Sequence, residues 1–301
     1  MINTIVHGDC LEVAKHMEPG SVDLILTDPP YGNMNTDGGR RLGINGWDFI
    51  ISPDELFQTA NTLLRKNGKS IFFSQEPYTS GLITKAIPNL PFSYRAIWEK
   101  DNFANCLGAN KNMVSMFEDI LVFSKTHDQE GLHPLREYFK SVMDYIGLNL
   151  KQINSKLGHR RAEHTFYIDS TQFGLCTQKT YTELIGVFGI DQMEGFIAYA
   201  ELRKIDKKYD STFNLWEGKK YKSNILKYKK DYGGLHPTQK PVLLLEDLIK
   251  TYSNPGDLVV DLTIGSGSTA VACINTGRNF IGIEKDEQYC KIACQRIEQH
   301  Q

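Results

Sequence analysis

The 301-residue sequence lacks the features typical of membrane, secreted and zinc-binding proteins. No stretch approaches the ~20 apolar residues that span a bilayer, and the first residues contain neither the basic nor the apolar region of a signal peptide. The six cysteines are scattered, as expected of reduced thiols in the cytoplasm. Cys290 and Cys294 have helical spacing, but no histidine or second cysteine pair completes a zinc set. These absences predict a cytoplasmic protein that requires no metal.

The net charge of −2 conceals an uneven distribution of charge along the chain. Residues 125–233 carry 18 lysines and arginines against 14 aspartates and glutamates, whereas the remainder carries 16 against 22. Basic and aromatic residues also interleave in this segment, at residues 204–209, 219–222 and 228–230, which suits backbone contacts and base stacking. A basic segment in an acidic chain indicates a polyanionic partner for that segment.

The tetrapeptide Asp28-Pro29-Pro30-Tyr31 directly follows an apolar run, residues 22–27, that is typical of a buried parallel strand. The prolines cannot continue a strand ladder, and they stiffen the backbone where an open α/β sheet places its ligand crevice. The Asp28 carboxylate and a rigid carbonyl could accept both N–H bonds of an exocyclic amine while Tyr31 stacks on the ring. The motif alone is equally compatible with an ordinary turn after a strand.

A second motif lies near the other end of the chain. A strand, the turn Gly265-Ser266-Gly267, a helix and a strand ending at Glu284 form a nucleoside-binding unit, in which Glu284 can accept both ribose hydroxyls. The spacing also matches the dinucleotide fingerprint of NAD enzymes. However, only 31 residues follow Ala270, too few for the rest of a dinucleotide fold. The carboxylate of Asp261 also repels a pyrophosphate and attracts a cation, which favours S-adenosylmethionine.

The middle of the chain departs from this alternation of strands and helices. Two helix-like segments, from Leu135 to Ile146 and from Leu150 to Leu157, precede the basic cluster His159-Arg160-Arg161. This order resembles a helix-turn-helix unit that reads DNA, although two packed amphipathic helices produce the same pattern. Nearer the N-terminus, residues 32–48 are expected to form a loop that could close over a substrate and contact phosphates through Arg40 and Arg41, or an ordinary surface loop.

In this order the motifs resemble the β class of DNA amino-methyltransferases, in which the catalytic motif precedes the cofactor motif. The resemblance covers about residues 1–125 and 234–301, and it includes His236-Pro237-Thr238-Gln239-Lys240-Pro241. One departure is Leu262-Thr263, where the family usually has Pro-Phe. The resemblance implies that the target base is held by Asp28, Pro29, Pro30 and Tyr31. It implies cofactor contacts from Asp9 to the adenine, from Thr238 and Lys240 to the methionine end, and from Asp261, Gly265, Gly267 and Glu284.

The permuted motif order implies a circularly permuted, Rossmann-like α/β sheet of seven mostly parallel strands. The strands are expected near Ile5, Leu26, Phe72, Ile97, Val122, Val259 and Ile281, and the alternation up to residue 125 predicts that this part is parallel. Residues 1–125 would form the catalytic half, 126–233 a mainly helical target-recognition insertion, and 234–301 the cofactor-binding half.

The implied activity is site-specific methyl transfer from S-adenosylmethionine to N6 of a flipped adenine in double-stranded DNA, of the restriction–modification type. The chain could act as a homodimer. Asp28 favours adenine, because family members that act on N4 of cytosine tend to have serine there. A DNA-binding protein that has lost catalysis is the alternative from another class, and the intact Asp28 and glycine motif argue against it.

Overall fold

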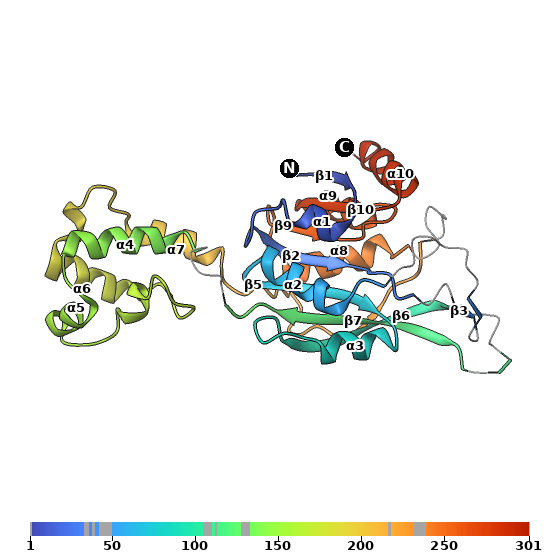
Figure 1. Cartoon of the computed structure of the whole chain (residues 1–301), viewed down its shortest axis with the longest axis horizontal. Coiled ribbons are helices and arrows are strands. Elements are labelled where there is room, and N and C mark those ends of the chain that lie inside the picture. Colours follow the sequence, from blue (N-terminus) through green and yellow to red (C-terminus); the bar gives the residue numbers. More distant parts are fainter. Residues whose placement is uncertain are drawn as a thin grey trace. The chain divides into compact units, whose positions relative to one another are not determined.

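The computed structural model describes residues 2–32, 36–37, 40–41, 50–104, 110–111, 113–127, 133–215, 218–231 and 239–300. The chain forms two compact units, Met1–Thr126 with Thr212–Gln301, and His127–Ser211 (Figure 1). The first unit contains β1 (Thr4–His7), α1 (Cys10–Ala14), β2 (Val22–Thr27), β3 (Thr36–Asp37), β4 (Arg40–Arg41), α2 (Pro53–Leu63), β5 (Leu64–Ser74), α3 (Tyr78–Thr84), β6 (Phe92–Ala104), β7 (Ser115–Ser124), β8 (Ile225–Lys227), α8 (Val242–Tyr252), β9 (Leu258–Asp261), α9 (Ser268–Thr276), β10 (Asn279–Glu284) and α10 (Glu287–Glu298).

The large sheet of the first unit has the strand order β1-β10-β9-β2-β5-β7-β6-β8. All seven predicted strands are present, and the sheet is mostly parallel, as expected. The count of seven is wrong, because β8 adds an eighth strand, pairing in parallel with β6. With three residues, of which only Leu226 is buried, β8 leaves little signal in the sequence. The expectation of parallel strands throughout residues 1–125 is also wrong, since β7 runs antiparallel to both β5 and β6.

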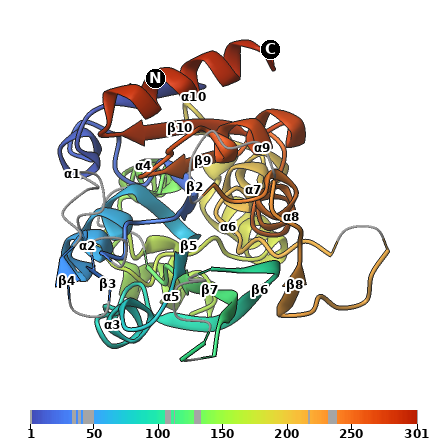
Figure 2. The same ribbon diagram turned by 90° about the vertical axis from the view of Figure 1, so that its right-hand side faces the viewer.

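Helices cover both faces of this sheet, with α1, α2 and α3 on one face and α8 and α9 on the other (Figure 2). Successive residues of β2 therefore enter opposite cores. Leu24 and Leu26 pack with residues of α8 and α9, whereas Ile25 packs with residues of α1, α2 and α3. A strand that is buried on both faces needs an almost continuous apolar sequence, which explains the run that precedes Asp28.

The order of the strands reverses between β9 and β2, which lie side by side and in parallel. From β9 the chain continues to β10 on one side, and from β2 it continues to β5 on the other. An open α/β sheet has its ligand crevice beyond the carboxyl ends of the strands at such a point. The two predicted motifs, at Asp28 and after Asp261, follow these two strands and meet there.

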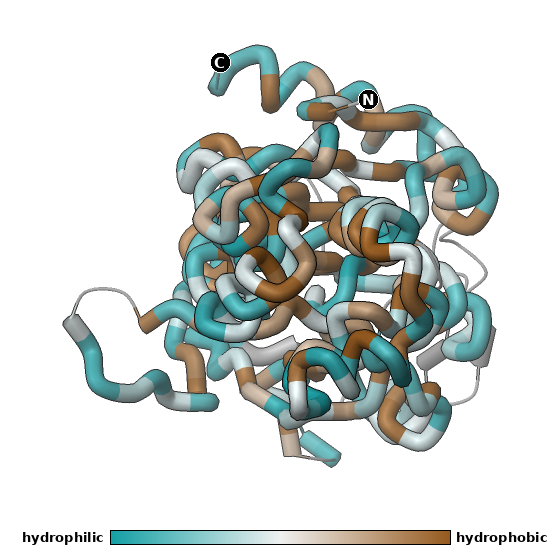
Figure 3. Tube along the Cα trace, turned by 90° about the vertical axis from the view of Figure 1, so that its left-hand side faces the viewer, coloured by the Kyte–Doolittle hydropathy of each residue, from teal (hydrophilic) through white to brown (hydrophobic). Residues whose placement is uncertain are grey.

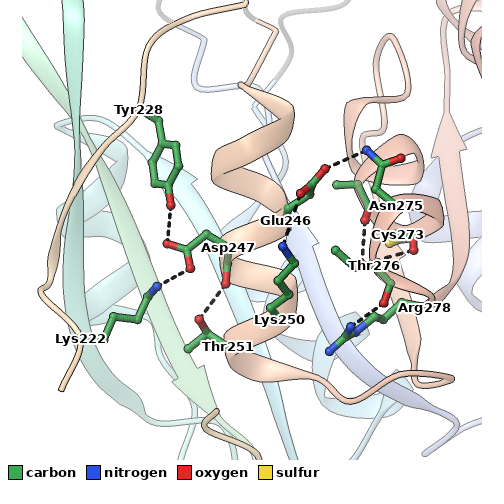
Figure 4. Close-up of polar contacts among 11 residues, drawn as sticks. Lys222, Tyr228, Glu246, Asp247, Lys250, Thr251, Cys273, Asn275, Thr276 and Arg278 are labelled. Carbon is green, nitrogen blue, oxygen red and sulfur yellow. Dashed lines mark hydrogen bonds and ion pairs between the residues drawn. The ribbon is translucent and has the colours of Figure 1, made fainter. Parts of the chain in front are cut away.

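The segment that carries β8 is fastened to α8 through Asp247, a buried carboxylate. Its Oδ1 pairs with Lys222, and its Oδ2 accepts a hydrogen bond of 2.8 Å from the hydroxyl of Tyr228 (Figure 4). Residues 212–231 thus belong to the first unit, whereas the insertion predicted from the sequence extends to residue 233. The second compact unit ends at Ser211.

The second unit is helical and has its own hydrophobic core, which includes Phe139 and Tyr181. Gly147 and Gly158 end the first two helices with φ of 66° and 73°. The predicted helix ends at Ile146 and Leu157 are therefore confirmed. Along the trace, hydrophobic and hydrophilic residues alternate, as in helices that bury one face (Figure 3). No helix in the described part of the chain is both long and apolar enough to span a membrane. The elements are α4 (Leu135–Ile146), α5 (Leu150–Leu157), a 3-10 turn (Glu163–Phe166), α6 (Gln178–Phe188), a 3-10 turn (Ile190–Gln192) and α7 (Tyr199–Lys207).

Candidate active site

A cavity of about 760 Å³ lies at the carboxyl ends of β2 and β9. Thr238 lies outside the described residues, as do the side chains of Arg40 and Arg41, whose backbone forms β4. Gly267 lies in the adjoining turn but does not line the cavity. The structure brings together, in the cavity wall, the predicted site residues Asp9, Asp28, Pro29, Pro30, Tyr31, Lys240, Asp261, Gly265 and Glu284.

Both carboxylate oxygens of Asp28 accept a hydrogen bond. The Tyr31 hydroxyl donates to Oδ1, and the Lys240 ammonium donates to Oδ2. Burial raises the pKa of Asp28 and the charge of Glu118 adds to this effect, while Lys240 opposes it. Burial, followed by the neighbouring Asp28 charge, raises the pKa of Tyr31 well above its usual value, so this hydroxyl stays a donor. The turn therefore presents the Asp28 carboxyl group beside an aromatic ring.

The Lys240 ammonium also contacts Glu118, whose Oε2 is 3.2 Å from Nζ. Lys100 pairs with the other oxygen of Glu118 at 2.5 Å. Burial opposes the ionisation of Glu118, but the two lysines outweigh it and lower its pKa. Two lysines and two carboxyl groups therefore form a cluster in the cavity wall. A role for Glu118 and Lys100 in the site was not predicted from the sequence. The only local signal was the position of Glu118, a charged residue, beside the apolar run of a predicted strand.

Thr263 connects the two turns that border the cavity. Its hydroxyl donates to the carbonyl oxygen of Asp28 at 3.0 Å and lies 2.8 Å from the hydroxyl of Thr27. The carbonyl of Asp28, one of the predicted amine acceptors, thus already accepts one hydrogen bond. Thr263 stands where the family usually has phenylalanine, and here it supplies a polar link between the two turns.

Asp261 orders the turn that follows β9. One carboxylate oxygen accepts from the Thr263 amide at 3.0 Å, and the other accepts from the Thr269 hydroxyl at 2.6 Å. Burial raises the pKa of Asp261 to about 6, and the nearby charge of Asp28 adds to the shift. Asp261 therefore has a structural role, since it orders the turn through these two hydrogen bonds. Its attraction of a cationic cofactor stays a prediction.

Glu284 holds the other side of the same turn. Its two oxygens accept from the amides of Gly265 and Asp286, each at 2.8 Å. Gly265 and Gly267 have φ of 53° and 85°, where side chains are strained, and a Cβ on Gly267 would lie 3.2 Å from Ala293 of α10. The glycines are thus required by backbone conformation and, at Gly267, by close packing against a helix.

Asp9 lies at the start of α1, where Oδ1 accepts from the Leu11 amide at 3.0 Å. Oδ2 pairs with the exposed Lys285 at 3.0 Å. The hydrogen bond from Lys285 lowers the pKa of Asp9 in spite of its partial burial. An ionised acceptor therefore remains at the cavity edge, near Glu284.

The basic cluster of the second unit is partly neutralised within that unit. Arg160 donates two hydrogen bonds of 2.8 Å to Glu163. Arg161 lies 3.4 Å from Glu183, which also accepts from His159 at 2.7 Å. Both arginines remain exposed, and they follow α5 instead of lying within it. A role in DNA binding stays a prediction.

The sequence matches the family model described as DNA methylase, of the N6 and N4 type, over residues 22–295. DNA adenine methyltransferase YhdJ of Escherichia coli (strain K12) is 27% identical over 299 residues, which are 98% of this chain and 82% of that protein. The solved M1.HpyAVI–SAM complex has a similar fold, with a TM-score of 0.57, 21% identity and 98% coverage of both chains. The structure of PvuII DNA methyltransferase, described as cytosine-N4-specific, is also similar, with a TM-score of 0.53, 14% identity and coverage of 97% of this chain and 85% of that one. Since the family model spans most of the sequence, the chain belongs to the DNA methylase family.

Proposed function

We propose that this protein transfers a methyl group from S-adenosylmethionine to N6 of adenine within a specific sequence of double-stranded DNA. The observation that carries the proposal is the position of Asp28. Its carboxylate borders the cavity on a proline-stiffened turn, beside Tyr31 and next to the glycine-rich turn after β9. We also propose that the protein works in the cytoplasm, where its proposed substrate would lie in a bacterial cell.

The residues of the cavity fit S-adenosylmethionine. Carboxylates of Asp9, Asp261 and Glu284 line one region of the wall, and such an anionic surface suits a cation better than a phosphate. Glu284 would accept ribose hydroxyls through the free lone pairs of its oxygens, and Asp9 would face the adenine. When bound, the cofactor supplies a methyl group on a positively charged sulfur.

Asp28 and Tyr31 perform the chemistry on the target base. The amine of adenine is a weak nucleophile, because its lone pair is delocalised into the ring. Acceptance of its N–H bonds by the Asp28 carboxylate and by a carbonyl of the Asp28–Pro29 turn would let the nitrogen pyramidalise. Such positioning and electrostatic stabilisation are most effective in a pocket that excludes water.

The target base must first leave the duplex, at a cost of a few kcal/mol. The ring of Tyr31 borders the cavity and packs against the ring of Tyr78, with ring centroids 6.0 Å apart. Stacking on such a ring returns ~1–3 kcal/mol per base. Two features support adenine over cytosine: aspartate, not serine, at position 28, and the similarity to an adenine methyltransferase over almost the whole chain.

The proposal is tested by incubating the purified protein with DNA and S-adenosylmethionine that carries a labelled methyl group. The expected result is stable incorporation of label into DNA by the native protein and none by Asp28→Ala, while both bind the cofactor equally in calorimetry. Incorporation by Asp28→Ala at the native rate would remove Asp28 from the mechanism. Cofactor binding without any incorporation by the native protein would favour a DNA-binding protein that lacks catalysis.

A further inference from the structure

Lys240 bridges two carboxylates in the wall of the active site. Its ammonium contacts Oδ2 of Asp28 and lies 3.2 Å from Oε2 of Glu118. Lys240 is only 7% exposed, and its Nζ lies 5.2 Å from the ring centroid of Phe73. A largely buried ammonium that loses one carboxylate is destabilised unless another anion lies within reach.

The charge of Lys240 opposes the proposed reaction. The oxygens of Asp28 accept one hydrogen bond each, from Tyr31 and from Lys240, so the target amine would have to share an oxygen with one of these two donors. In the transfer step the amine nitrogen bonds to the methyl carbon, and sulfur keeps the electron pair of the broken C–S bond. Positive charge thus develops on the nitrogen until its extra proton passes to Asp28 and then to water. A second cation on Asp28 opposes this charge.

Glu118 offers the alternative position for the ammonium. Its Oε1 pairs with Lys100 at 2.5 Å, whereas its Oε2 has no hydrogen bond of good geometry within the described part of the chain. This oxygen faces Lys240 at 3.2 Å, so a small side-chain movement would replace the contact to Asp28 by one to Glu118. The exchange keeps the Lys240 ammonium paired, and the target amine takes its place on Asp28.

We propose that Glu118 is a positioning residue that takes over the Lys240 ammonium when the target amine binds to Asp28. Without a base, Lys240 keeps the Asp28 carboxylate paired. With a base, Glu118 holds Lys240 away from the nitrogen on which charge develops. This inference rests on the proposed function and assigns to Glu118 a role in the transfer step, not in cofactor binding.

The first test compares Glu118→Gln, Glu118→Asp and the native protein in a single turnover on DNA that contains the methylated site, once that site has been mapped by sequencing. Glu118→Gln is expected to slow transfer at least tenfold while the Kd values for S-adenosylmethionine and DNA change less than twofold. Glu118→Asp keeps the charge and should restore part of the rate. Glu99→Gln, which removes an exposed carboxylate paired with Lys227 on the neighbouring strand, serves as the matched control and should have no effect.

The second test repeats Glu118→Gln in a Lys240→Met background, where no ammonium needs to be moved. The loss of rate caused by Glu118→Gln should then shrink to less than threefold. An equal loss in both backgrounds, or a fall in cofactor affinity that matches the fall in rate, would overturn the inference. If Glu118→Gln does not fold, Glu118→Asp takes its place in both backgrounds. A native rate of Glu118→Asp in the presence of Lys240, with a reduced rate only when it is combined with Lys240→Met, would also contradict the inference. Absence of transfer by the native protein would refute the proposed function itself.

Discussion

Thr263 Oγ1 donates a hydrogen bond to the carbonyl oxygen of Asp28 at 3.0 Å, although the two residues are 235 positions apart in the sequence. The link joins the turn that presents the acceptor for the target amine to the turn that presents the cofactor. It exists because β2 and β9 lie side by side in the sheet. The hydroxyl therefore adds a direct link between two turns that the pairing of the strands already brings together.

Replacing Thr263 with valine removes this link while keeping the shape of the side chain. Loss of the hydrogen bonds to Asp28 and Thr27 should lower the free energy of unfolding by about 1–3 kcal/mol, since each such bond contributes ~0.5–1.5 kcal/mol. Denaturant unfolding measures the loss, and Thr263→Ser, which keeps the hydroxyl, is the control. Equal stability of the valine and serine variants would show that the link does not hold the turns together.

Replacing Glu284 with alanine should weaken the binding of S-adenosylmethionine at least tenfold and leave DNA affinity nearly unchanged. The carboxylate orders Gly265 and would accept ribose hydroxyls, and a hydrogen bond to a charged group is worth ~1.5–3 kcal/mol. Calorimetry measures the affinity. Glu287→Ala, which removes an exposed carboxylate of the following helix, is the matched control. Native affinity in the Glu284 variant would refute the assignment of the cofactor site.

The raised pKa of Asp261 predicts a dependence of stability on pH. The carboxyl titrates near pH 6 in the folded protein and near pH 4 in the unfolded chain, so only the folded protein holds the proton between these values. The contribution of this group to stability is therefore complete below pH 4 and is lost as the pH rises to 6, by about 3 kcal/mol.

Asp261→Asn cannot ionise, so its free energy of unfolding should gain about 3 kcal/mol relative to the native protein between pH 4 and pH 7. Urea unfolding of both proteins across this range measures the difference. A difference that does not change with pH would show that the carboxyl titrates alike in the folded and unfolded chains.

Replacing Arg160 and Arg161 with alanine tests the predicted DNA contact of the second unit. If both arginines contact phosphates, duplex binding should weaken, and the slope of log K against log salt should fall by about two units. If either arginine binds a guanine edge, the loss should depend on the DNA sequence, at ~1–3 kcal/mol for each good bidentate pair. Cofactor affinity should not change.

The matched control for this experiment is Arg203→Ala. Like Arg160 and Arg161, Arg203 is an exposed arginine of the second unit that pairs with a carboxylate, in this case that of Asp206. Binding measurements over a salt series, on a methylated site and on random duplex, separate the two roles. Unaltered binding of the double variant to both duplexes, or an equal effect of Arg203→Ala, would contradict the predicted contact.

The parts of the site that sequence could predict depend on local signals. The prolines after Asp28 and the glycines after Asp261 are needed by the backbone at those positions, and an apolar run precedes each motif. Such features restrict the conformation of their own segment, so a single sequence reveals them. The convergence of the two motifs followed from the general position of ligand sites in open α/β sheets.

The missed parts depend on contacts between distant segments. Glu118, near the start of β7, lies at the cavity edge because β7 runs antiparallel to β5 and β6, and there it meets Lys100 of β6. Strand direction is not encoded in the apolar pattern of a strand. The two carboxylate partners of Lys240 could not be predicted from the sequence for the same reason. The motif that contains Lys240 predicts a contact to the cofactor. In the structure, the Lys240 ammonium contacts the carboxylates of Asp28 and Glu118, which precede it in the sequence by 122 residues or more.

The identity of the methylated nucleoside distinguishes N6 methylation of adenine from the alternative activities. DNA treated with the native protein and S-adenosylmethionine is digested to nucleosides, which are separated and identified by mass spectrometry, with DNA treated with Asp28→Ala as the control. We expect N6-methyladenine in the DNA treated with the native protein and none above background in the control. N4-methylcytosine instead of N6-methyladenine, or the same N6-methyladenine in both samples, would contradict this expectation.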